Sequence, residues 1–511
     1  MLIESRRKSS GEEPRARRLL GEVSIENVFF AALLAAVILR LWILPLRNGF
    51  WLDETGTFWA AQGTLREVLS HSLLWPSQFP AYSVLMWTML HVPGPPEILM
   101  RLPSIAAMAI GVCFVFRIGV RLASRRAAWI AAVVFTSLEP VAFAAADARP
   151  YALGLMAVCG AMLMLLRWLE RGSLRDGLIY AVLVALTWHM HYTFATTFIA
   201  QAAYVTFVAY RRRVRLNFLQ LPWIVLTALL LGSLSETHLA AMLHTATSHG
   251  FAGSPNLAEL FTVLAPPALT CTVVLGLAIA CVFTRAVQVE FFFSRPEHLV
   301  FLLSWLLLPA VIPFAVSVVS NAKIFLPRYI LPYTPALALL LGLLIASIRP
   351  AAVRIFVLLA AISASIVSAH GLADVSHGGD WRMAMRALPS ISDGSPILFR
   401  SGFPESNPFN WQTDFPRTAY LLAPLAAYPV AGDIIALPFR FDTAAHRELE
   451  QITASRLESR DRFVLLEMGD TSYDFWLTGR LSAAGFHSRT VAGFGGPHDS
   501  LRILIFSKAR A

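Results

Sequence analysis

The sequence predicts an α-helical polytopic membrane protein with about eleven transmembrane helices and a small C-terminal α/β extracytoplasmic domain. Of the 511 residues, 56% are hydrophobic and 14% are charged, whereas a soluble chain carries about 25% charged residues. The mean hydropathy is +0.60. Apolar runs of roughly 20 residues, enough to cross a bilayer, recur as far as Ala369. Beyond Ala369 the sequence becomes mixed and polar.

The basic residues follow the pattern of cytoplasmic loops. The net charge is +10, and Lys and Arg gather in short clusters between apolar runs. This distribution argues against a nucleic-acid partner and makes the lipid bilayer the expected one. The four cysteines fall inside apolar runs and are expected to be core residues; they are Cys113, Cys159, Cys271 and Cys281.

The N-terminal tail, residues 1–24, is basic and is expected to stay in the cytoplasm. It is too long and too charged for a cleavable signal peptide, so a signal anchor fits better. The first span therefore exits outward and opens a transmembrane domain at residues 25–370. We expect spans at roughly 27–46, 99–122, 127–145, 151–168, two that meet at 188–192, then 218–234, 261–283, 299–319, 329–348 and 353–369.

The first outer loop, residues 47–98, contains an apolar stretch that decides the topology. Phe79–Val92 has only about 14 residues and is bounded by prolines, which favours a juxtamembrane helix over a span. With this choice, the later basic clusters all fall on the cytoplasmic side. The same count places residues 371–511 outside the membrane.

The C-terminal segment, residues 371–511, is expected to be an α/β domain because short apolar strands alternate with helical stretches such as Thr443–Leu457. The expected strands are Pro396–Phe399, Asp433–Leu437, Phe463–Leu466 and Leu501–Phe506.

An acidic pair, Asp53 and Glu54, follows the first span. Its residues either mark the membrane boundary beside the aromatic Trp51, or they supply a general base or a metal ligand. A second acid, Asp147, precedes Arg149. These two either cap the next helix and pair locally, or Arg149 serves as a phosphate clamp.

Two further cations, Lys323 and Arg328, oppose the positive-inside bias on the outer face. They either reach toward lipid head groups or bind an anionic lipid phosphate.

His189 and His191 could bind a metal, but their spacing favours packing at the membrane boundary. The sequence has no Walker loop and no GxGxxG after a strand, which argues against ATP-driven transport and nucleotide-dependent redox chemistry.

Five short motifs follow one another along the chain. They are Asp53-Glu54, Arg101-Leu102-Pro103-Ser104, Asp147-Ala148-Arg149-Pro150-Tyr151-Ala152-Leu153, Pro327-Arg328-Tyr329-Ile330-Leu331-Pro332 and Asp380-Trp381-Arg382. These elements, in this order, resemble bacterial GT-C glycosyltransferases of the protein O-mannosyltransferase and aminoarabinose-transferase superfamily, especially the rhizobial galacturonosyltransferase-like branch. The resemblance covers roughly residues 25 to 400.

The resemblance implies a glycosyltransferase of a bacterial inner membrane that takes its sugar from a polyprenyl-phosphate donor. The acceptor would be a glycan, a lipid or a protein in the periplasm. Asp53 would be the catalytic carboxylate, Glu54 would support it, and Asp147 would be a second acidic site residue. Some relatives use a divalent metal, and the sequence assigns no metal ligand.

Cations would stabilise the phosphate that leaves. Those that we assign to this role are Arg149, Lys323 and Arg328. The other residues that we expect to line the site are Tyr151, His191, Tyr192 and Tyr329.

Two other functions remain open. One is a flippase or transporter of lipid-linked sugars, which would also need many helices and outer cations. Transporters usually show broken helices at mid-membrane and an internal repeat, and no clear repeat is visible here. The other is a non-catalytic accessory protein, against which the presence of Asp53 and Asp147 argues mildly.

Overall fold

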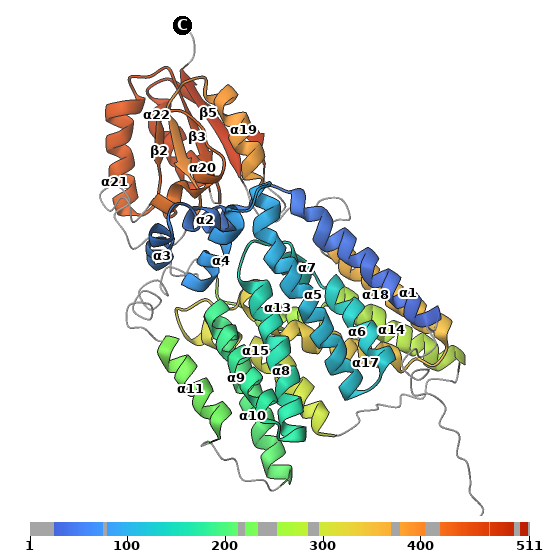
Figure 1. Cartoon of the computed structure of the whole chain (residues 1–511). Helices are drawn as coiled ribbons and strands as arrows, with labels where there is room; N and C mark the ends of the chain where they lie inside the picture. Colours follow the sequence, from blue (N-terminus) through green and yellow to red (C-terminus); the bar gives the residue numbers. More distant parts are fainter. Residues whose placement is uncertain are drawn as a thin grey trace, which may run out of the picture.

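The computed structural model describes the chain at residues 25–74, 79–212, 220–233, 253–284, 296–368, 379–403, 419–469, 471–494 and 501–508. A large helical part comes first in the chain, and a smaller α/β unit follows at one end of it (Figure 1). The basic tail expected at residues 1–24 lies outside the described residues.

The helical part begins with a long helix and three short ones, and then builds a bundle of longer helices. Its α-helices are α1 (Ile25–Ile38), α2 (Leu52–Ala60), α3 (Leu65–Leu74), α4 (Pro80–Leu90), α5 (Pro96–Leu122), α6 (Arg125–Ser137), α7 (Glu139–Ala145), α8 (Tyr151–Arg171), α9 (Leu174–Met190), α10 (Thr196–Arg212), α11 (Leu221–Ser233), α13 (Leu257–Leu264), α14 (Pro267–Thr284), α15 (Glu297–Val319), α16 (Pro327–Ile330), α17 (Thr334–Ala346) and α18 (Ala351–Ser368).

Local sequence sets several of these helix ends. The side chain of Ser124 caps α6 by accepting a hydrogen bond from Ala127 N, as Ser-type caps do. Helix α8 ends at Gly172, whose φ of 65° is the left-handed conformation that glycine adopts without strain. Pro140 lies at the start of α7, and α6 and α7 meet at a bend of 71°.

Five helices in the described part of the chain are long and apolar enough to cross a membrane, and seven if each bent pair forms one span. Within the described residues, the segments that the sequence marked as spans are mostly helical, and they include the shorter apolar helices α11 and α18. The protein is thus a multi-pass membrane protein, and the number eleven stays a prediction. Helix α4 lies within the stretch expected not to cross and is not among the spanning candidates.

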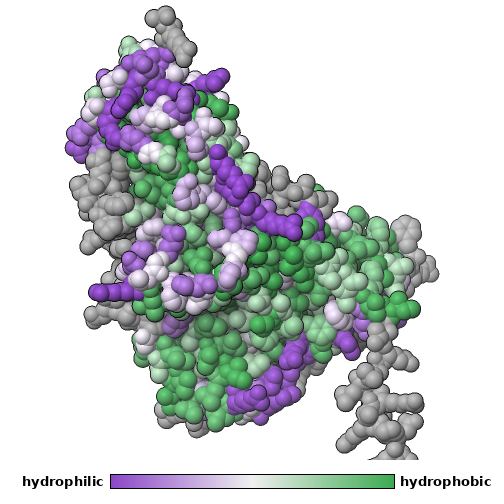
Figure 2. Space-filling view, turned by 45° about the horizontal axis from the view of Figure 1, so that its top comes forward, coloured by the Kyte–Doolittle hydropathy of each residue, from purple (hydrophilic) through white to green (hydrophobic). Residues whose placement is uncertain are grey.

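The surface of the helical part suits lipid. Large apolar side chains stay exposed on it, such as Leu231, Val274 and Phe356. In Figure 2, hydrophobic residues dominate this part, whereas hydrophilic ones gather on the α/β unit and along the opposite rim.

Small residues let the inner helices approach one another. A Cβ on Gly342 of α17 would lie 2.7 Å from Ala131 Cβ and 2.8 Å from Ala131 N on α6. A Cβ on Gly119 of α5 would lie 2.8 Å from Ala128 Cα, also on α6. Close backbone contact at small residues is the packing mode of membrane helices.

The α/β unit, residues 381–508, contains a mixed five-stranded sheet in the order β2-β1-β3-β5-β4. Strand β1 pairs in parallel with β2 and β3, whereas β5 is antiparallel to both β3 and β4. Its elements are α19 (Trp381–Ser392), β1 (Ile397–Arg400), α20 (Ala423–Ala427), β2 (Ile434–Ala436), α21 (Thr443–Ile452), β3 (Arg462–Glu467), α22 (Ser472–Ser482), β4 (Phe486–Gly493) and β5 (Arg502–Lys508).

The first outer loop lies between the two parts. Helix α2 packs against α20, and its residues share a hydrophobic core with α19 and the sheet. In Figure 1, α2 and α4 lie beneath the strands and above the long helices. The start of α2 therefore contacts both parts of the protein.

Candidate functional site

Helix α2 begins directly after an extended residue, Trp51, and carries the acidic pair in its first turn. The backbone N–H of Trp51 donates to Glu54 Oε2 at 3.2 Å, as in the carboxylate half of a capping box. Negative charge in the first turn also suits the helix dipole. The local sequence thus explains why Asp53 and Glu54 start a helix.

The carboxylate of Glu54 is fully buried and points at Arg101 of α5. Arg101 Nε donates to Glu54 Oε1 at 2.7 Å, and Arg101 Nη2 pairs with Glu54 Oε2. The backbone N–H of Ala148 donates to Oε1 at 2.8 Å. These contacts from α5 and from Ala148 fix the carboxylate, so Glu54 is an internal anchor of α2.

Arg101 also holds the segment that leads into α2. Its Nη1 donates to the carbonyl oxygens of Leu46 at 3.1 Å and Asn48 at 2.8 Å, and its Nη2 donates to that of Gly49 at 3.0 Å. These carbonyls lie at and just after the end of the first spanning candidate, Ile25–Arg47, where no further helical turn satisfies them. One buried guanidinium thus fixes the end of the first helix and the start of α2.

Asp53 lies on another side of α2 and faces two cations. Asp53 Oδ2 is 3.6 Å from Arg328 Nη1 and 3.9 Å from Arg149 Nη2, and its side chain is 17% exposed. Two guanidiniums and one carboxylate leave one net positive charge. Both separations are longer than a close charge-assisted hydrogen bond, so the cations do not saturate the carboxylate.

Arg149 connects this group to the body of α2. Its Nη1 lies 3.3 Å from Thr57 Oγ1 and 3.5 Å from the carbonyl oxygen of Asp53. Its guanidinium carbon lies 5.7 Å from the centre of the Tyr151 ring. Arg149 Nη2 is thus directed to Asp53 across the site, and a local pair of Arg149 with Asp147 stays a prediction.

Asp147 is buried behind α2. Its Oδ1 accepts a hydrogen bond of 3.0 Å from Trp51 Nε1, and its backbone oxygen accepts one of 2.6 Å from Ser104 Oγ. Burial raises the pKa of the Asp147 carboxyl well above its ordinary value, and the charge of Glu54 adds to this shift. Asp147 does not cap α8, whose N-cap is Pro150 without a side-chain bond.

The four remaining site-lining candidates form one aromatic cluster. The ring of His191 lies 4.9 Å from that of Tyr329, 5.2 Å from Tyr151 and 5.2 Å from Tyr192. His191 Nδ1 is 2.7 Å from Thr193 Oγ1. Because Tyr151 and Tyr329 also contact Arg149 and Arg328 through their ring faces, the cluster forms a wall beside the two cations.

Lys323 is placed differently from the two arginines. Its Nζ donates to the carbonyl oxygens of Ser317 and Ser320 at 2.7 and 3.1 Å, and to Ser254 Oγ at 2.7 Å. These carbonyls end α15, where a cation suits the helix dipole. The structure thus gives Lys323 a capping position, and its expected contact with phosphate stays a proposal.

Among the residues that the structure describes, no group of three or more His, Cys, Asp or Glu side chains could hold a metal ion.

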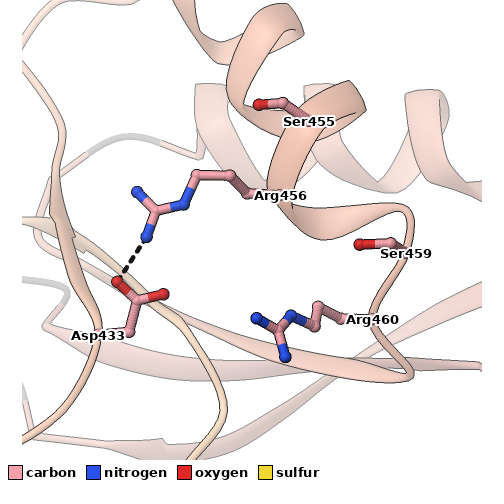
Figure 3. A pocket seen from close by; sticks show the side chains of 5 residues that line it. All are labelled: Asp433, Ser455, Arg456, Ser459 and Arg460. Carbon is pink, nitrogen blue, oxygen red and sulfur yellow. Dashed lines mark hydrogen bonds and ion pairs between the residues drawn. The ribbon is translucent and has the colours of Figure 1, made fainter.

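A hollow lies away from Asp53, on the α/β unit (Figure 3). There Arg456 Nη2 donates to Asp433 Oδ1 at 2.5 Å, and Arg460 lies beside them. This hollow lies at the amino ends of β2 and β3, at the edge of the sheet opposite α2.

A solved structure shares this architecture, and a known family matches part of the sequence. The family of dolichyl-phosphate-mannose-protein mannosyltransferases matches residues 76–235. The crystal structure of ArnT from Cupriavidus metallidurans bound to undecaprenyl phosphate has the same fold, with a TM-score of 0.54 and 11% identity over 95% of this chain and 99% of that one. Its apo state gives a TM-score of 0.50 and 12% identity over 94% and 98%. No curated protein matches the chain.

The family match and the shared fold together confirm the resemblance to the GT-C membrane glycosyltransferases. Three further residues near the acidic pair, Arg101, Trp51 and Thr57, were not among the predicted site residues. The Arg101-Leu102-Pro103-Ser104 motif was a usable signal for Arg101, because an arginine near the start of an apolar helix needs a partner. Nothing in the sequence singles out Thr57.

Proposed function

We propose that the protein is a membrane glycosyltransferase that moves a sugar from a polyprenyl-phosphate donor to an extracytoplasmic acceptor. The single observation that carries the proposal is the position of Asp53, with one carboxylate oxygen facing both Arg149 and Arg328. A carboxylate beside surplus positive charge offers a base and an anion site within a few ångströms. Sugar transfer from a lipid phosphate needs both.

In the proposed reaction, a hydroxyl of the acceptor attacks the anomeric carbon of the sugar. Asp53 takes the hydroxyl proton as the new carbon–oxygen bond forms. The bond between the anomeric carbon and the phosphate oxygen breaks, and the polyprenyl phosphate leaves as an anion. Arg149 and Arg328 stabilise that anion, because preorganised cations act where charge develops. The aromatic wall would pack against the sugar or the first part of the lipid.

The lipid donor draws support from the environment of the site. Asp53 follows the first long apolar helix, and Arg328 opens another spanning candidate, so a ligand in the bilayer can reach both. The similar ArnT structure holds undecaprenyl phosphate. We place the site on the periplasmic face of a bacterial inner membrane, with the N-terminus in the cytoplasm, because that orientation leaves the basic clusters inside.

The test is transfer by purified protein in proteoliposomes. Labelled sugars on undecaprenyl phosphate would be supplied with a panel of glycolipid, glycan and peptide acceptors, and labelled product would be measured. We expect Asp53→Asn to lose at least about 100-fold in rate, the lower range for a general base. Asp461→Asn, which changes an exposed acid of the α/β unit, is the matched control and should keep wild-type transfer.

Full transfer by Asp53→Asn would refute the role of its carboxylate. A lipid-linked sugar flippase is the second function to test, in the same vesicles. Movement of the labelled lipid between leaflets, without transfer to any acceptor, would favour that function over the transferase.

A further inference from the structure

The α/β unit and the helix that carries Asp53 share one hydrophobic core. Leu52 and Trp59 of α2 are buried in the same cluster as Trp381 of α19, Phe399 of β1 and Leu466 of β3. The chain separates these segments by more than 300 residues. Because buried apolar contacts resist displacement, the α/β unit restrains α2 directly.

The contact occurs at the carboxyl edge of the parallel strands. Gly402 follows β1 and has a φ of 98°, which suits glycine, and a Cβ there would lie 3.4 Å from Leu52 Cδ2. Met468 follows β3 and lies beside Gly402. In open α/β sheets this edge is the usual place for a ligand. Here the start of α2 occupies part of it.

Polar contacts join the same surfaces. Tyr428, just after α20, accepts a hydrogen bond of 2.8 Å from the backbone N–H of Phe50. Its hydroxyl donates to Glu97 Oε1 at 3.1 Å, at the start of α5. Arg382 Nη1 lies 3.5 Å from the same oxygen, and Arg382 Nη2 donates to the carbonyl oxygen of Arg47 at 2.9 Å. The segment before α2 is thus tied to α5 and to the α/β unit.

We propose that the α/β unit acts as a clamp that sets the position of Asp53, with Tyr428 as its positioning residue. Asp53 is the residue after Leu52, so a shift of α2 by about 1 Å would change its separations from Arg149 and Arg328, and misplacement of that size is costly in active sites. Tyr428 touches neither the carboxylate nor the cations, and it acts through the backbone of Phe50. This clamp deepens the proposed function. It rests on that function in one respect, namely that undecaprenyl phosphate binds beside Asp53.

The test compares two matched tyrosine variants of the full-length protein in detergent. Tyr428→Phe removes the tie to Phe50 and Glu97. Tyr473→Phe removes a hydroxyl that donates to Pro438 O at 3.0 Å inside the α/β unit, away from α2. A second variant, Tyr428→Phe with Arg382→Met, removes both polar ties to the segment before α2.

Two measurements are made on each protein. Hydrogen exchange followed by mass spectrometry reports the opening of residues 49–60, because local opening controls amide exchange. Undecaprenyl phosphate is the probe for binding. We expect exchange in this segment to rise by about five-fold in Tyr428→Phe, the loss of about one hydrogen bond, and further in the double variant. Binding should weaken in the same order, whereas Tyr473→Phe should match the wild type in both.

Equal exchange at residues 49–60 in the double variant and in Tyr473→Phe would overturn the clamp. Increased exchange there with unchanged undecaprenyl phosphate binding would overturn the positioning role. If the wild-type protein itself binds no undecaprenyl phosphate, the proposed donor fails, and the exchange contrast still decides whether the clamp exists.

Discussion

Glu54 and Arg101 form an ion pair whose side chains are 0% and 1% exposed. They lie 47 positions apart, on α2 and α5, and they exchange two side-chain contacts. Neither group has access to solvent, so removing one partner would leave the other as an uncompensated buried charge. The pair is therefore a requirement for the folded arrangement of the first outer loop.

We expect Arg101→Met to lower the free energy of unfolding by about 3–5 kcal/mol, the usual cost of breaking a buried pair. Thermal unfolding in detergent, followed by intrinsic fluorescence, would measure the loss. The control is Arg121→Met at the other end of α5, whose partner Glu170 is partly exposed; its cost should stay near 0–1 kcal/mol. Equal losses in the two variants would contradict the anchoring role of Arg101.

The two arginines beside Asp53 should differ from Lys323 in binding lipid phosphate. We expect Arg328→Met and Arg149→Met each to weaken undecaprenyl phosphate binding by about 10-fold or more, since a hydrogen bond to a charged group contributes about 1.5–3 kcal/mol. Lys323→Met, which removes a cap of α15, should change the melting temperature more than the affinity. Titration of labelled undecaprenyl phosphate would measure each affinity. A larger loss in Lys323→Met than in Arg328→Met would reverse this assignment.

Asp147 should make stability depend on pH. Its pKa is raised in the folded protein by burial, so the folded state keeps a proton that the unfolded state releases above a pKa of about 3.9. Stability therefore falls as pH rises between that value and the raised folded pKa. Asp147→Asn removes this dependence and keeps an acceptor for Trp51 Nε1. We expect its unfolding free energy, relative to the wild type, to increase with pH.

Unfolding of the wild type and of Asp147→Asn at several pH values would measure this difference. Asp147→Ala is the contrasting variant, because it leaves the buried Trp51 N–H without its acceptor, at a cost of about 1–3 kcal/mol. A constant difference between wild type and Asp147→Asn at all pH values would refute the raised pKa.

The close packing of α17 on α6 should tolerate no side chain at Gly342. A Cβ there would meet the backbone nitrogen of Ala131 at 2.8 Å, and backbone cannot move aside cheaply. We expect Gly342→Ala to destabilise the protein by about 1–3 kcal/mol. Gly232→Ala in α11, where nothing lies within 4 Å, is the matched control and should be neutral or slightly stabilising. Their melting temperatures give the comparison.

The helices could be predicted from the sequence because membrane spans depend on local apolar length. The bend between α6 and α7 was missed, although Pro140 offered a signal, since the residue before a proline avoids the helical conformation. Strand β4 was missed for a different reason. Only Phe486 of its residues is buried, so this edge strand has no apolar pattern.

The sequence predicted which residues belong to the candidate site better than it predicted which acid pairs with which arginine. The sequence motifs predicted Asp53, Glu54 and Arg149 as site residues. Which acid faces which cation depends on tertiary contacts, because Asp53 and Glu54 are adjacent in the sequence and the fold gives them different cation partners. Glu54 forms a buried ion pair with Arg101, whereas Asp53 faces Arg149 and Arg328. The rotation of α2 that separates them is fixed by partners distant in sequence.

The core shared by α2 and the α/β unit also decides how this protein can be recombined with its relatives. A boundary drawn at residue 371 would cut through contacts between Leu52, Trp59 and the sheet. A chimera that takes residues 381–508 from another protein should therefore take the segment 49–60 from the same source. The inherited building block is discontinuous in sequence, and a graft of its C-terminal piece alone would leave the helix of Asp53 on a mismatched surface.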